Sequence, residues 1–157
     1  MGVAMWHTVL VLIHAAAAIA ALGLGIAALR LTPLLRAHTV SIVIMTALLP
    51  VAIALRWTER APATTAIFSA LAALGVVMIV RAVLAERAAR LGYHGAVLSH
   101  IGFNLIALVT GFLIVPVMRS GLGTLAITAT AIVVPVAGSV ALHLIRRRIP
   151  ADPAPAD

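Results

Sequence analysis

Five long apolar segments constrain the fold of this chain more than any other feature of its sequence. Each is close to the roughly 20 residues that an α-helix needs to cross about 30 Å of hydrocarbon. Only helices and closed barrels satisfy their backbone in lipid, and barrel strands would alternate in polarity. The sequence therefore predicts an all-α integral membrane protein. The predicted bundle has five transmembrane helices, at residues 5–29, 39–55, 65–85, 93–117 and 122–145.

The composition supports the same class of protein. Of 157 residues, 64% are hydrophobic and 10% are charged, whereas a typical soluble domain is about 45–50% apolar and about 25% charged. Residues 1–149 are predicted to form one transmembrane domain, and the Pro- and Ala-rich residues 150–157 a disordered tail. The chain has no cysteine, which excludes disulfides, thiolate metal sites and thiol nucleophiles.

The basic residues indicate an orientation in the membrane. All of them are arginines, and most lie between the apolar segments. More of them fall on the cytoplasmic side if the N-terminus is outside, so the positive-inside rule predicts an N-out/C-in protein of a bacterial inner (plasma) membrane. Arg36, Arg87 and Arg146 are expected at the inner surface. Topology explains the charge, and aromatic residues are only 4%, so the lipid bilayer rather than nucleic acid is the expected partner.

Histidines are the main candidates for a functional site. His100 is expected about 10 Å deep in the fourth helix, with Asn104 one turn further on the same face. His143 and His38 lie near the same predicted end of their helices, and His14 lies within the first helix. Cofactor binding is predicted at these four histidines, with His100 and His143 as the metal-binding pair because their expected depths differ by only about 7 Å. The competing interpretation of each is an interhelical hydrogen bond.

Two further features have expected roles inside the bundle. Asn104, Ser139, Thr128 and Pro135 are expected to line a polar pocket, since the polar residues of the last helix fall roughly on one side. Arg81 is placed about one turn before the inner end of the third helix. There it is expected to reach the lipid headgroups or to pair with Glu86.

Three functions are consistent with these features. The first is binding of haem b or a transition metal for membrane redox chemistry, in a histidine-centred polar site in the cytoplasmic half, with Arg36, Arg87 and Arg146 available to haem propionates. The second is a non-catalytic subunit or assembly partner of a larger membrane complex. The third is a small-ligand transport bundle that acts as a homo-oligomer. No acidic residue lies in an apolar segment, which argues against a carboxylate-based ion pump, and whether the protein is an enzyme stays open.

Overall fold

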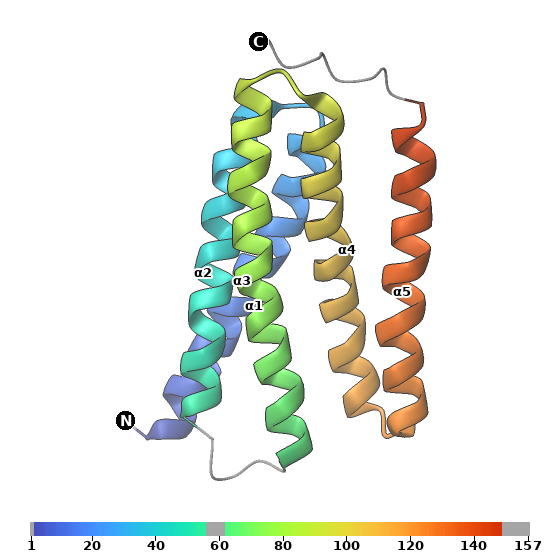
Figure 1. The fold of residues 1–157 in the computed structure, drawn as a ribbon. Coiled ribbons are helices and arrows are strands. Elements are labelled where there is room, and N and C mark those ends of the chain that lie inside the picture. The colour runs from blue at the N-terminus through green and yellow to red at the C-terminus, as the bar shows by residue number, and fades with distance from the viewer. Residues whose placement is uncertain (1, 56–61, 149–157) are drawn as a thin grey trace. The chain divides into compact units, whose positions relative to one another are not determined.

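The apolar segments all form helices in the computed structural model, which describes residues 2–55 and 62–148. Its five long helices are α1 (Val3–Ala28), α2 (Leu35–Ala54), α3 (Pro62–Arg90), α4 (His94–Arg119) and α5 (Gly123–Arg146), and a short 3-10 helix, η1 (Thr32–Leu34), precedes α2 (Figure 1). No strand occurs in these two ranges. Each long helix is long and apolar enough to cross a membrane. The predicted five-helix, all-α architecture is confirmed at this level, and the predicted disordered tail lies outside the described residues.

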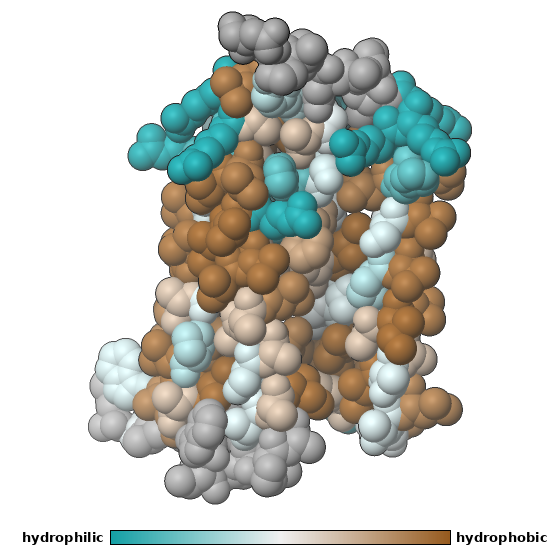
Figure 2. Space-filling view, viewed as in Figure 1, coloured by the Kyte–Doolittle hydropathy of each residue, from teal (hydrophilic) through white to brown (hydrophobic). Residues whose placement is uncertain are grey.

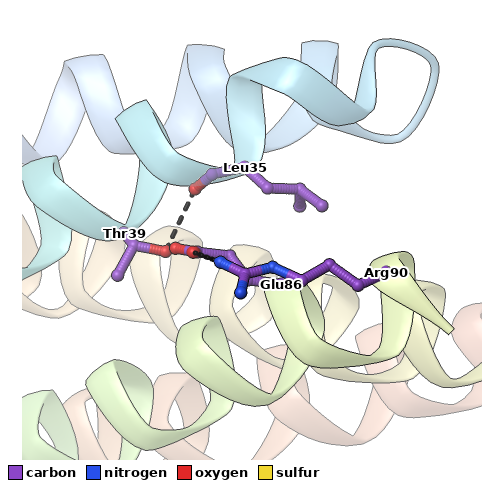
Figure 3. Close-up of polar contacts among 4 residues, drawn as sticks. All are labelled: Leu35, Thr39, Glu86 and Arg90. Carbon is purple, nitrogen blue, oxygen red and sulfur yellow. Dashed lines mark hydrogen bonds and ion pairs between the residues drawn. The ribbon is translucent and has the colours of Figure 1, made fainter.

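The third helix is longer than predicted and ends at Arg90 instead of near residue 85. The added segment is rich in strong helix formers, and Glu86 Oε2 lies 3.9 Å from Arg90 Nη2, one turn further along (Figure 3). Because the Arg90 side chain is 80% exposed, this pair stabilises the helix by only a few tenths of a kcal/mol. The longer helix places Arg81 about 13 Å along the axis before Arg90, well inside α3.

A tight turn at Gly92 joins α3 to α4. Gly92 has φ +75°, a left-handed conformation that a glycine adopts without steric cost. The N–H of Tyr93 donates to the Ala88 carbonyl at 2.9 Å, and the N–H of Gly92 donates to the Ala89 carbonyl at 3.2 Å. This is the Schellman pattern that ends a helix. Because the connection is so short, α3 turns directly into α4.

The second helix begins earlier than the predicted residue 39. Pro33 lies in the first turn of η1, where its missing N–H is tolerated, and α2 follows directly from Leu35. Thr39 Oγ1 donates to the Leu35 carbonyl at 3.0 Å (Figure 3). His38 therefore lies within the first turn of a continuous helix.

The chain divides into two compact units, Met1–Val80 and Arg81–Asp157, which are described separately. In the first unit, α1 presents small buried residues and α2 presents larger ones. The buried residues of this contact include Ala18, Ala21 and Ala28 of α1 and Leu35, Ile42 and Met45 of α2. Small side chains let the two helix backbones approach closely, as in other helix pairs of membrane proteins.

In the second unit, α4 and α5 pack antiparallel through two matching contacts (Figure 1). A Cβ added to Gly102 would lie 2.5 Å from Leu142 Cδ1, and a Cβ added to Gly138 would lie 2.7 Å from Ile106 Cγ1. α4 thus supplies Gly102 and, one turn later, Ile106, which covers Gly138 of α5. α5 supplies Gly138 and, one turn later, Leu142, which covers Gly102 of α4. The sequence pattern itself sets the register of this helix pair.

The outer surface of the helices is apolar. Leu12 is 64% exposed, Ile19 62% and Leu125 85%. Figure 2 shows hydrophobic colour over most of the visible face, with hydrophilic side chains gathered at the end where α3 finishes and α4 begins. Such continuous exposed apolar surface is expected of helices whose solvent is hydrocarbon.

Candidate functional site

Two histidines of the first unit join α1 to α2. His14 Nδ1 lies 2.8 Å from the Met45 carbonyl oxygen, and His38 Nδ1 lies 2.8 Å from the Ala21 carbonyl oxygen. A carbonyl can only accept, so in both cases Nδ1–H is the donor. α1 supplies His14 and, two turns later, the Ala21 carbonyl. α2 likewise supplies His38 and, two turns later, the Met45 carbonyl. The two bonds therefore repeat one another about a local two-fold axis.

For these two histidines, the structure shows the interhelical hydrogen bond that the sequence analysis gave as the alternative to cofactor binding. His38 and Ala21 are both 0% exposed. Because the side chain of Ala21 is only a methyl group, the His38 ring can reach the Ala21 carbonyl. The two hydrogen bonds are separated by two helical turns, about 10 Å along the axis. Two nitrogens on one metal lie roughly 4 Å apart, because each bond is about 2 Å long. His14 and His38 are therefore not arranged to share a metal ion.

The second unit contains a different polar centre, formed by Arg81 of α3 with His100 and Phe103 of α4. Arg81 Nη1 lies 3.2 Å from His100 Nδ1, and Arg81 Cζ lies 4.8 Å from the centroid of the Phe103 ring. His100 and Phe103 are one turn apart on α4 and so present one face to the guanidinium. We call these three residues the Arg81 centre.

The Arg81 centre fixes the hydrogen-bonding roles of His100. A guanidinium has donors only, so His100 Nδ1 must accept, and the neutral ring then carries its proton on Nε2. The ring of Phe103 offers the negative face of its π-system to the same guanidinium. In the described part of the chain, the interactions of the Arg81 guanidinium are thus with two uncharged rings.

These roles do not favour His100 as a metal ligand. A ligating histidine needs a lone pair at the metal and usually donates its other N–H to a carbonyl or carboxylate. His100 would have to give up its hydrogen bond with Arg81 to present such a lone pair. Within residues 2–55 and 62–148, no group of three or more His, Cys, Asp or Glu residues could hold a metal ion. Binding of haem b or a transition metal stays a prediction, which the absorption spectrum and metal content of the purified protein test.

The structure gives His100 and His143, the predicted metal-binding pair, different surroundings. The contacts of Gly102 with Leu142 place the two histidines at nearly the same level of the antiparallel helices α4 and α5. His100, however, is about 200° around α4 from Gly102, and its partner is Arg81. His143 is exposed on α5. Metal binding by this pair stays a prediction.

The remaining predicted site residues are divided between interior and surface. Asn104 is 0% exposed and lies one turn beyond His100, whereas Pro135 is half-buried and Thr128 and Ser139 are exposed on α5. The basic residues Arg36, Arg87 and Arg146 are exposed near helix ends, and their location at an inner membrane surface stays a prediction. A pocket lined jointly by Asn104 and the α5 residues stays a prediction.

Arg81 is the candidate site residue that the sequence interpretation undervalued. Its signal was present, because it is a charged residue within an apolar segment. One turn from the end of its apolar segment, it looked like a residue that reaches the headgroups, and the sequence did not show its contacts with His100 and Phe103. No family model matches the sequence, and no curated protein or solved structure matches it either.

Proposed function

We propose that this chain is a five-span protein of the inner membrane, oriented N-out/C-in, that binds an anionic ligand at Arg81. One observation carries the proposal. The guanidinium lies well inside an apolar helix, and the groups around it are uncharged rings. A cation in such a place attracts an anion more strongly than any other ligand class.

Electrostatics supports this choice of ligand. An arginine at the centre of a transmembrane helix costs about 2.5–3.5 kcal/mol on insertion scales, and one nearer the helix end, as Arg81 is, costs less. A cation–π contact returns about 0.5–2 kcal/mol, and a hydrogen bond between helices about 0.6 kcal/mol on average. Neither contact supplies a counter-ion for the positive charge of Arg81. A carboxylate or phosphate oxygen would supply it through charge-assisted hydrogen bonds to the free edge of the guanidinium.

The geometry of the Arg81 centre is suited to binding rather than to covalent chemistry. His100 uses Nδ1 to hold one edge of the guanidinium, while Phe103 covers one face. Both contacts restrict the side chain, which lowers the entropy lost when a ligand is bound. His100 and Phe103 are therefore positioning residues in this proposal, and Arg81 contacts the ligand.

Replacement Arg81→Gln tests the proposal. We expect acetate, benzoate or dodecanoate to raise the thermal midpoint of the purified wild-type protein, since a ligand at 100 times its Kd adds about 2.7 kcal/mol of stability. We expect no ligand-induced shift in Arg81→Gln. Without ligand, this variant is expected to be at least as stable as the wild type, because glutamine removes a charge from an apolar helix.

The matched control is Arg87→Gln, which removes an equal charge from an exposed position near the end of the same helix. Its ligand-induced shift is expected to equal that of the wild type. Equal shifts in all three proteins, or none with any of the three anions, would contradict the proposal. A loss of stability in ligand-free Arg81→Gln would instead assign Arg81 a structural role.

An assembly role is the second candidate, and α5 favours it. The structure describes every residue of α5, and none of its side chains is buried. Thr128, Ser139 and His143 are among its exposed residues, and in hydrocarbon such side chains are usually found at helix–helix contacts. A homo-oligomer or a larger complex would cover this surface. The mass of the particle extracted under mild conditions tests this candidate.

A further inference from the structure

We infer that the anion bound at Arg81 is the carboxylate of a single-chain amphiphile that enters from the hydrocarbon side. The inference rests on the proposed function and names the class of ligand. It follows from the surroundings of the Arg81 centre in three steps: the access along the helices, the access from the side, and the depth of the guanidinium.

The helix faces between Arg81 and the end of α3 are apolar and do not favour a hydrated anion. On α3, the face between Arg81 and the helix end carries Ala85, which is 0% exposed, and Ala88, which is 7% exposed. On α4, Val97 lies one turn before His100 and is 7% exposed. None of these three side chains has a polar group that could replace the water lost by a small inorganic anion.

Access from the side is open and apolar. Arg81 itself is only half-buried. Its neighbours on the same side of α3 are exposed aliphatic residues: Val77 is 46% exposed, Val80 53% and Leu84 37%. A hydrocarbon chain can lie along these residues while its charged end contacts the guanidinium. This combination of one cation and a bordering apolar strip fits an amphiphile and not a freely soluble anion.

Depth favours a carboxylate over a phosphate headgroup. A carboxylate and the phosphodiester of a phospholipid each carry one negative charge, so charge alone does not distinguish them. The headgroup of a diacyl phospholipid is held at the interface. The Arg81 guanidinium lies against Phe103, about 13 Å along α4 from its first residue, His94, so a carboxylate that is not tied to a glycerol backbone reaches it more readily.

Binding of carbon-14-labelled dodecanoate tests the inference. The full-length protein is reconstituted in nanodiscs of neutral phosphatidylcholine, and binding to empty nanodiscs is subtracted. We expect saturable binding that is at least about tenfold tighter than that of acetate. In Arg81→Gln, binding is expected to weaken by about 10- to 100-fold, the range that corresponds to loss of hydrogen bonds to a charged group. Arg87→Gln is expected to bind as the wild type does.

Two competitors test whether the site requires a carboxylate on a single chain. Dodecanol has the same chain without the charge, so an excess of it is expected to leave dodecanoate bound. Phosphatidylglycerol in the nanodisc is likewise expected not to displace dodecanoate. Displacement of dodecanoate by dodecanol or by phosphatidylglycerol would overturn the inference.

The remaining outcomes separate this inference from the proposed function. Equal Arg81-dependent binding of acetate and dodecanoate would overturn the amphiphile and leave the anion site standing. Dodecanoate binding of equal strength in the wild type and Arg81→Gln, with no Arg81-dependent acetate binding, would overturn both. Arg81-dependent binding of dodecanoate alone supports both.

Discussion

Replacement of His38 by alanine is expected to lower the free energy of unfolding by about 2–4 kcal/mol, the usual cost of deleting a large buried side chain. His38 is 0% exposed, and its ring fills the contact between α1 and α2 while Nδ1–H donates to the Ala21 carbonyl. Alanine would remove both the hydrogen bond and the packing. Unfolding of the purified protein in mixed micelles, titrated with a denaturing detergent, measures this change.

Two further variants separate the causes and control the experiment. His38→Phe keeps a ring in the same place but removes the donor, so we expect a smaller loss, about 0.6–1.7 kcal/mol, in the range of hydrogen bonds between membrane helices. His94→Ala removes an exposed histidine at the start of α4 and is expected to change stability by less than about 0.5 kcal/mol. Equal effects of His38→Ala and His94→Ala would show that the reciprocal histidine bonds do not hold α1 and α2 together.

Replacement of Gly75 by alanine is expected to cost about 1–3 kcal/mol through overpacking. A Cβ at Gly75 would lie 2.7 Å from Thr46 Oγ1, 2.8 Å from Cγ2 and 3.2 Å from Cβ. Threonine is branched at Cβ and restricted in χ1, so its side chain cannot swing away without a shift of the helix. Thr46 is 7% exposed, and its Oγ1 has no hydrogen-bond partner in the described part of the chain.

The pair can therefore be tested as a double-mutant cycle. Thr46→Ala alone is expected to be nearly neutral, because it removes a buried hydroxyl that forms no hydrogen bond. The double variant Gly75→Ala/Thr46→Ala is expected to regain most of the stability lost in Gly75→Ala. Gly23→Ala is the control, since a Cβ there meets no atom within 4 Å and alanine favours the helix. A double variant no more stable than Gly75→Ala would contradict this packing.

The helices were largely predictable from the sequence because length and hydropathy determine them. Five apolar segments became five helices, and the errors lie at their ends. α3 continues to Arg90 through a segment that is polar but strongly helix-forming. Hydropathy marks where hydrocarbon ends, not where a helix ends, so the end of α3 was misjudged, while Arg81 stays about one turn inside the apolar segment.

The partners of the polar residues were much less predictable. Depth estimates paired His100 with His143, but the partner of His100 is Arg81, a residue of α3. Which face of a helix meets which neighbour depends on small residues such as Gly102, whose contact with Leu142 sets the rotation of α4 against α5. Such contacts join residues far apart in the sequence, and the spacing of a glycine and a large aliphatic residue on one helix does not say which helix it meets.

Solid-state NMR on the protein in bilayers tests the central claim, an anion on Arg81, most directly. The protein is labelled with nitrogen-15 in its arginine side chains and loaded with dodecanoate labelled with carbon-13 at the carboxylate. We expect a dipolar contact between the carboxylate and guanidinium nitrogens, at a nitrogen–oxygen distance of about 2.8 Å, which disappears in Arg81→Gln and persists in Arg87→Gln. A contact of the same strength in Arg81→Gln, or no contact in the wild type, would contradict the account.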